Sequence, residues 1–197
     1  YNSETTDTSK ILLSKIRTPN LIKKSISTPE EISNLLSWVQ GNEFSKSCVE
    51  MAFYDLFGKL TNKRLVDLIG GKKKKLLISH TVSIHQSPER CLNETKKYID
   101  KGAEYIKLKI KPGYDILYVK QILKKFPNIQ LMIDANASYK LSLRSIKLFK
   151  KFDLANIIYI EQPLEQDDII DHSKLQSSLK VPIALDESIK STHDILK

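Results

Sequence analysis

Cysteine is scarce in this sequence: Cys48 and Cys91 are the only two among 197 residues. Two cysteines this far apart along the chain make neither a disulfide framework nor the closely spaced ligand set of a zinc site. We interpret both as reduced packing residues. The sequence therefore predicts a fold whose stability comes from a buried apolar core.

Long apolar runs are also missing. No stretch approaches the roughly 18–20 consecutive apolar residues that are needed to span a membrane. The first residues, Tyr1 to Glu4, lack the basic and apolar regions of a signal peptide. These absences favour a cytoplasmic protein without a membrane partner. The first residue is not methionine, which favours a fragment of a longer protein.

Nucleic-acid-binding motifs are absent as well, although the formal net charge is +9. Lysines supply most of this charge and are spread along the chain, with one cluster at residues 72–75. We therefore predict a solvated basic surface and no nucleic-acid partner. A basic protein that binds a polyanion stays as an alternative.

Residues 105–113 read YIKLKIKPG and set the organisation of the chain. Apolar residues alternate here with three lysines, Lys107, Lys109 and Lys111. Alternation with period two predicts a strand with all three lysines on one face. On an inward face, burial favours the neutral amine, so such a lysine is a candidate base. The alternative is an edge strand on which lysines prevent aggregation.

Alternating strands and helices are predicted from residue 75 onward, after helices at 28–40, 44–60 and 65–69. The predicted strands are residues 76–84, 105–110, 130–133, 157–160 and 181–185. Serial βα units indicate an α/β fold with a parallel sheet and helices outside it. We expect residues 1–74 to form a helical unit and residues 75–197 to carry the βα units.

Charged residues end successive predicted strands at nearly constant spacing. The interval from Lys109 to Asp134 is 25 residues, the next interval to Glu161 is 27, and the last interval to Asp186 is 25. A TIM barrel devotes roughly 30 residues to each βα unit and has its active site at the carboxyl ends of the strands. The spacing thus favours a barrel in which all four residues share one rim.

Three carboxylates on one rim would repel each other without a cation. A hard divalent ion with oxygen ligands would resolve the repulsion between Asp134, Glu161 and Asp186, and Mg²⁺ is the ion that we expect. The alternative is that they cap helices or pair with lysines. Lys107 lies two residues before Lys109 on the same face, and its charge favours the neutral, basic form of Lys109. A lysine base with a divalent metal is suited to removing a proton next to a carboxylate.

Four strings carry a resemblance to a known family: IKLKIKPGYD, LMIDANASY, IYIEQPLEQDD and VPIALDESI, with KSCVEMAFYDLFGKL upstream. Over residues 28–197 they closely resemble the muconate-lactonizing branch of the enolase superfamily. Within it they are most similar to the o-succinylbenzoate synthases, which overlap with N-succinylamino acid racemases. The resemblance implies a (β/α)7β TIM-like barrel preceded by an α+β capping domain. This chain would hold the helical part of the cap and about five of the eight strands.

The resemblance also implies roles for individual residues. Mg²⁺ would be held by the three carboxylates, and Lys109 would be the acid/base with Lys107 beside it. Asn136 and Glu187 would lie next to the metal or its ligands, and Ser83 would face the substrate.

The implied function is a Mg²⁺-dependent dehydration of a small carboxylate substrate in menaquinone biosynthesis. An N-succinylamino acid racemase or dipeptide epimerase is the alternative within the superfamily. A non-catalytic remnant or basic binding protein that kept the fold is the alternative from a different functional class. In the family a second lysine ends the sixth strand, beyond Lys197. We therefore expect the 197 residues to be inactive by themselves, while the full-length protein could form a homo-oligomer.

Overall fold

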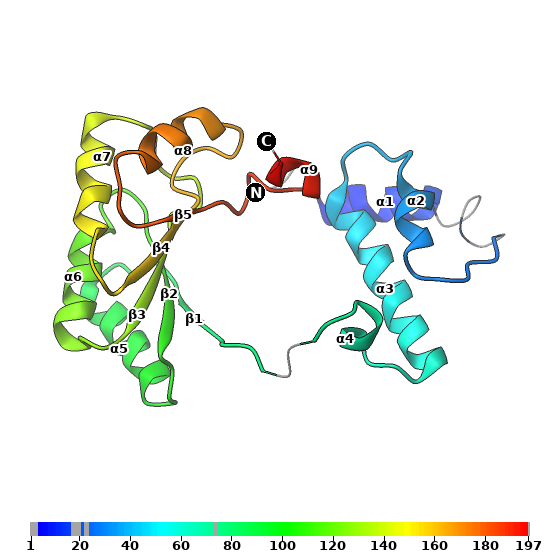
Figure 1. Cartoon of the computed structure of the whole chain (residues 1–197), viewed down its shortest axis with the longest axis horizontal. Coiled ribbons are helices and arrows are strands. Elements are labelled where there is room, and N and C mark those ends of the chain that lie inside the picture. Colours follow the sequence, from blue (N-terminus) through cyan, green and yellow to red (C-terminus); the bar gives the residue numbers. More distant parts are fainter. Residues whose placement is uncertain (1–3, 17–20, 22–23, 73–74, 197) are drawn as a thin grey trace. The chain divides into compact units, whose positions relative to one another are not determined.

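Two groups of elements make up the computed structural model, which describes residues 4–16, 21, 24–72 and 75–196. The chain divides into two compact units, Tyr1–Leu76 and Leu77–Lys197 (Figure 1). Each unit has its own cluster of buried apolar side chains.

The first unit is helical. Its helices are α1 (Thr6–Ile16), α2 (Glu31–Leu36), α3 (Glu43–Thr61) and α4 (Leu65–Leu68). Ile32, Leu36 and Val39 form its buried core, against which Val49 and Phe53 of α3 pack. The apolar positions of α2 and α3 thus meet each other, as expected for amphipathic helices that bury one stripe.

The helix predicted at residues 28–40 is shorter than expected. Helix α2 begins only at Glu31, whose carboxylate accepts the backbone N–H groups of Ser27 at 3.1 Å and Thr28 at 3.0 Å. These two amides are thereby satisfied by a side chain within the helix. Residues 28–30 form a bend and a turn before the helix.

The second unit is an α/β structure built on a five-stranded parallel sheet, which confirms the predicted fold class. The strands are β1 (His80–Val82), β2 (Tyr105–Lys109), β3 (Gln130–Asp134), β4 (Ile157–Glu161) and β5 (Ile183–Ala184), in the spatial order β1-β2-β3-β4-β5. The helices are α5 (Pro88–Ile99), α6 (Ile116–Lys125), α7 (Leu143–Phe149), the 3-10 helix η2 (Lys150–Phe152), α8 (Ile169–Gln176) and α9 (Thr192–Ile195). Sequential order with every pair parallel is the order of strands in a TIM barrel.

Strand β2 shows the alternation that its sequence predicts. Ile106, Leu108 and Ile110 are buried, whereas Lys107 and Lys109 on the other face are half-buried. Figure 1 shows α5, α6 and α7 along one side of the sheet, and their apolar residues join the same core. The apolar face of β2 therefore points to the helices, and the lysine face points away from them. In a TIM barrel, the face away from the helices is the inner face.

Strand β1 is much shorter than the predicted residues 76–84. It forms only where it pairs with β2, from His80 opposite Ile106 to Val82 opposite Leu108. Leu76, Leu77 and Ile78 precede it and are exposed. A strand requires a hydrogen-bonding neighbour, so the apolar residues before His80 do not extend it.

The two cysteines have different surroundings. Cys91 is buried in the core of the second unit, as expected for a packing residue, and Cys48 on α3 is exposed. The packing role predicted for Cys48 is therefore wrong. Among the described residues, no helix is both long and apolar enough to cross a membrane.

Candidate active site

The carboxyl ends of β2, β3 and β4 bring charged side chains together. Lys109 is the register partner of Asp134, and Asp134 is the register partner of Glu161. In a parallel sheet, register partners point to the same face and lie on neighbouring strands. The spacing of 25 and 27 residues in the sequence therefore does bring these three side chains to one rim.

Lys107 binds both carboxylates. Its ammonium donates a hydrogen bond to Glu161 Oε1 and lies 3.1 Å from Asp134 Oδ2. Burial lowers the pKa of Lys107, but the hydrogen bond to Glu161 and the negative charges of Asp134 and Glu161 outweigh this and raise the pKa above its ordinary value. Lys107 therefore stays protonated and acts as the counter-charge of the carboxylates.

Lys109 is held differently from Lys107. Its Nζ donates a hydrogen bond of 2.6 Å to Asn136 Oδ1 and lies 3.6 Å from Asp134 Oδ2. The amide of Asn136 in turn donates to Glu187 Oε1 at 3.1 Å. Lys109, Asn136 and Glu187 thus form a hydrogen-bonded chain beside the carboxylates, and an amide oxygen is the main partner of the amine.

The two inner carboxylates are deeply buried. Asp134 is 1% exposed and Glu161 is 8% exposed. Burial raises the pKa of Glu161, and the negative charges of Asp134 and Asp186 raise it further, while Lys107 lowers it. Like charges on neighbouring carboxylates thus oppose the ionisation of Glu161, and Lys107 favours it.

Asp186 and Ser83 lie at the ends of the two outer strands. Glu161 pairs with Ala184, and Asp186 follows two residues later as an exposed side chain. Thr81 pairs with Lys107, so alternation places Ser83, one residue past β1, on the lysine face. Both therefore end their strands on the side where the site residues lie.

Lys111 is separate from these residues, as its position after the strand predicts. It is exposed, and its ammonium lies 5.0 Å from the ring centroid of Tyr114. This is a cation–π contact in the loop after β2. Alternation alone makes the three lysines equivalent, and their partners separate them.

Gln162 is a site residue that the sequence motifs do not single out. It follows Glu161 directly and is fully buried. Its Oε1 accepts the backbone N–H groups of Asp186 at 2.9 Å and Ser188 at 3.2 Å. A polar amide between the charged end of a strand and a proline in IYIEQPLEQDD is the signal that could have indicated it.

The carboxylate oxygens at this rim are of the chemical type that binds a magnesium ion. Asp134 Oδ2 is buried and accepts no hydrogen bond; its neighbours are the two ammonium groups described above. Carboxylate oxygens are the ligands that Mg²⁺ prefers. In the part of the chain that is described, no three His, Cys, Asp or Glu side chains are close enough to hold a metal ion, and Lys107 contacts both Asp134 and Glu161. Asp134, Glu161 and Asp186 are the residues that would hold the ion.

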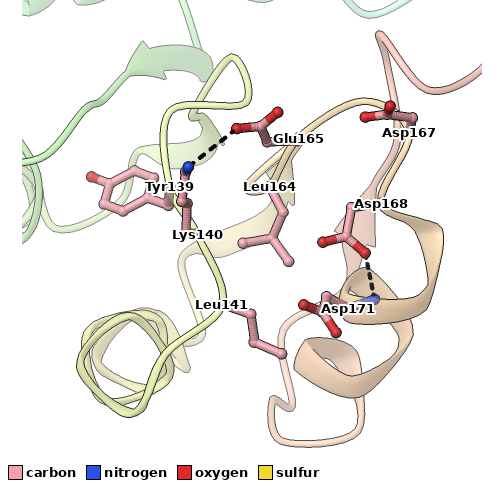
Figure 2. Close-up of a pocket in the computed structure, with 8 residues that line it drawn as sticks. All are labelled: Tyr139, Lys140, Leu141, Leu164, Glu165, Asp167, Asp168 and Asp171. Atoms are coloured by element: carbon pink, nitrogen blue, oxygen red, sulfur yellow. Dashed lines mark hydrogen bonds and ion pairs between the residues drawn. The ribbon is translucent and has the colours of Figure 1, made fainter.

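A separate pocket of about 550 Å³ lies between the segments that follow β3 and β4 (Figure 2). It is lined by Tyr139, Lys140, Leu141, Leu164, Glu165, Asp167, Asp168 and Asp171. The Asp168 side chain accepts the backbone N–H of Asp171 at 3.0 Å, and Asp171 pairs with Lys174. These carboxylates therefore have structural partners, and the lining includes none of the predicted site residues.

Comparison with known proteins identifies the family. Residues 90–197, more than half of the chain, match the family described as enolase C-terminal domain-like. The chain belongs to this family. The enolase superfamily that the four sequence strings resemble is thereby confirmed, and the five strands correspond to part of its TIM barrel.

The relatives of this chain carry the names of two different enzymes. The chain is 37% identical to an o-succinylbenzoate synthase of Listeria innocua, covering 99% of this chain and 52% of that protein. It is 36% identical to an N-succinylamino acid racemase of Thermus thermophilus, covering 96% of this chain and 51% of that protein. The chain thus spans about half the length of the curated relatives that it matches.

Solved structures of the enolase superfamily share the fold. A superfamily member from Listeria innocua superposes with a TM-score of 0.90 at 37% identity, covering 100% of this chain and 52% of that one. A muconate lactonizing enzyme from Pseudomonas fluorescens, complexed with muconolactone, superposes with a TM-score of 0.89 at 25% identity, covering 98% of this chain and 54% of that one.

Proposed function

We propose that this protein is a magnesium-dependent, cytoplasmic o-succinylbenzoate synthase, a dehydratase of menaquinone biosynthesis. Its small carboxylate substrate would bind at the rim formed by β2, β3 and β4. One observation carries the proposal: a lysine amine, Lys109, lies against an amide and a buried carboxylate at the carboxyl ends of neighbouring parallel strands. Relatives of this name at 34–37% identity support the choice of reaction.

Lys109 would be the base of this reaction. Its neutral amine would take a proton from the carbon next to the substrate carboxylate. The Lys109 ammonium formed in this way would then give the proton to the hydroxyl group, which leaves as water. Asn136 Oδ1 accepts a hydrogen bond from Nζ and so fixes the direction of the amine. A positioned general base contributes typically 10²–10⁴-fold to a rate.

Asp134, Glu161 and Asp186 would hold Mg²⁺ in the working site. When bound, the ion would supply positive charge that stabilises the negative charge developing on the substrate carboxylate. Lys107 would remain a cation beside this charge, because its raised pKa keeps it protonated. Two lysines two residues apart would thus have different tasks.

The test is an assay with Mg²⁺ and the cyclohexadiene carboxylate substrate of o-succinylbenzoate synthases. We expect turnover in the protein that carries this chain, and a loss of about 10²–10⁴-fold in kcat for Lys109→Ala. Lys111→Ala is the matched control, because Lys111 lies on the same segment but contacts Tyr114. Equal activity of both variants would contradict the role of Lys109.

N-succinylamino acid racemization is the second candidate, supported by the Thermus thermophilus relative. It would use the same metal ligands and Lys109, but needs a second acid/base on the opposite face of the substrate. Racemization of an N-succinylamino acid without dehydration of the cyclohexadiene substrate would favour it. Loss of Mg²⁺ binding in Asp134→Asn and Glu161→Gln is expected for both reactions.

A further inference from the structure

Gln162 connects the ends of three strands from within the protein. Its side chain is 0% exposed, directly after Glu161 at the end of β4. Its Oε1 accepts the N–H groups of Asp186 and Ser188 in the loop after β5. Its Nε2 donates to Ser188 Oγ at 2.7 Å and to Leu164 O at 3.2 Å.

Every hydrogen-bonding position of this amide is therefore used. A glutamine side chain has two donor hydrogens and an oxygen with two lone pairs, and here four bonds satisfy them all. A buried amide whose hydrogen bonds are all made favours one position of the loop, because moving the loop would leave a buried polar group unpaired. The position of the loop at residues 186–188 is thus tied to the end of β4.

The backbone of Gln162 adds links to both neighbouring strands. Its N–H donates to Ala184 O in β5, and its C=O accepts the N–H of Ala137 after β3, each at 2.8 Å. Gln162 has a φ of 38°, in the left-handed region that residues with a side chain seldom adopt. Such a conformation persists only where its surroundings determine it, and it is common at functional sites.

We propose that Gln162 is a positioning residue for the magnesium site, setting the place of Asp186 relative to Asp134 and Glu161. This inference rests on the proposed function, in which these three carboxylates hold the ion. Asp186 follows a strand of only two residues and is exposed, so the sheet itself does little to fix it. The bonds from Gln162 to the backbone of Asp186 and Ser188 fix it instead.

Gln176 provides a matched control at the other end of β5. Its Oε1 accepts the N–H of Ile183 at 2.6 Å, and its Nε2 donates to Val181 O at 3.3 Å. Gln176 thus attaches the start of β5 through its side-chain amide, as Gln162 attaches the loop that follows β5. Only Gln162 attaches the segment that carries Asp186.

The experiment compares Gln162→Leu, Ser188→Ala and Gln176→Leu by two measurements on the protein. Hydrogen exchange, measured without metal, gives the exchange rates of the backbone amides of Asp186 and Ser188. Calorimetric titration with Mg²⁺ gives the metal affinity. For Gln162→Leu we expect faster exchange at both amides and an Mg²⁺ affinity that is lower by about 10–100-fold, as for other residues that orient metal ligands. For Gln176→Leu we expect faster exchange at Ile183 and unchanged affinity.

Ser188→Ala removes the hydroxyl oxygen that accepts a hydrogen bond from Gln162 Nε2. The change lies on a partly exposed loop, so it tests the inference even if Gln162→Leu fails to fold. It should speed exchange at Asp186 and weaken Mg²⁺ binding by a smaller factor. Unchanged exchange at Asp186 in the folded variants would overturn the inference, as would faster exchange with unchanged affinity. If the unaltered protein binds no Mg²⁺, the proposed function fails, and with it the positioning role, while exchange still shows whether Gln162 holds the loop.

Discussion

Asp134 and Glu161 are register partners at the carboxyl ends of β3 and β4, and the ammonium of Lys107 contacts both. Two buried carboxylates on neighbouring strands repel each other, and burial adds a desolvation penalty. Lys107 therefore supplies the positive charge that this pair requires without metal. The magnesium ion that we propose would take over this task.

Removing the charge of Lys107 is expected to destabilise the metal-free protein. Lys107→Met should lower the free energy of unfolding by about 2 kcal/mol, less than the roughly 3–5 kcal/mol for a fully buried pair. The expected loss is smaller because the Lys107 side chain is 24% exposed, so solvent weakens its interaction with the carboxylates. Urea unfolding in the presence of a chelator measures the change. Mg²⁺ should stabilise the variant more than the unaltered protein, because it replaces the missing charge.

Lys120→Met is the control for this prediction, since Lys120 is an exposed lysine on α6. A surface substitution usually changes stability by less than about 0.5 kcal/mol. If both lysine variants lose the same stability, Lys107 is not the counter-charge of the carboxylates.

The apolar face of β2 should contribute more to stability than an exposed residue of the same type. Leu108 is 1% exposed, and Leu108→Ala should cost about 2–5 kcal/mol because it removes buried apolar contacts and leaves a cavity. Leu117 on α6 is 55% exposed, so Leu117→Ala should have little effect. Chemical denaturation of both variants compares them. Similar losses would show that β2 does not bury this face against the helices.

A hydrogen bond between two loops links the ends of β2 and β3. The buried Tyr139 hydroxyl donates to Asp115 Oδ2 at 3.2 Å, and Asp115 Oδ1 accepts the N–H of Ile116 at the start of α6. Tyr139→Phe should lower stability by about 1 kcal/mol. The same change in an Asp115→Ala background should cost much less. A double-mutant cycle from urea unfolding gives the coupling, and a value near zero would refute the link.

Alkaline pH should destabilise the fold through Cys91. Burial, with the negative charge of Glu94, raises the pKa of the Cys91 thiol from 9.0 to about 11. The folded state then keeps the thiol proton in a pH range where the unfolded state loses it. Stability from this group is therefore full below pH 9 and is lost as pH rises toward about 11, by at most about 1.4 kcal/mol per pH unit.

Unfolding at a series of pH values under reducing conditions tests this behaviour. Cys91→Ala should be less stable at pH 7 because of the lost packing, but its stability should fall less steeply between pH 9 and 11. Cys48 is exposed, so Cys48→Ala should follow the unaltered protein. Parallel curves for all three proteins would contradict the prediction.

Local sequence determined much of the second unit. Alternation in YIKLKI determined strand β2 and the face on which its lysines lie, because side chains alternate in any strand. Ser87 and Pro88 determined the start of α5, where the Ser87 side chain accepts the N–H of Arg90. Apolar runs alone did not determine the length of β1, because a strand also needs a partner to pair with.

The tertiary structure alone decided how the site residues are connected. Constant spacing along the chain places Lys109, Asp134 and Glu161 at successive strand ends, but only the register of the sheet brings them side by side. Folding also separated two lysines that alternation leaves equivalent, pairing Lys107 with carboxylates and Lys109 with an amide. Contacts between residues far apart in the sequence depend on packing, and no local pattern encodes them.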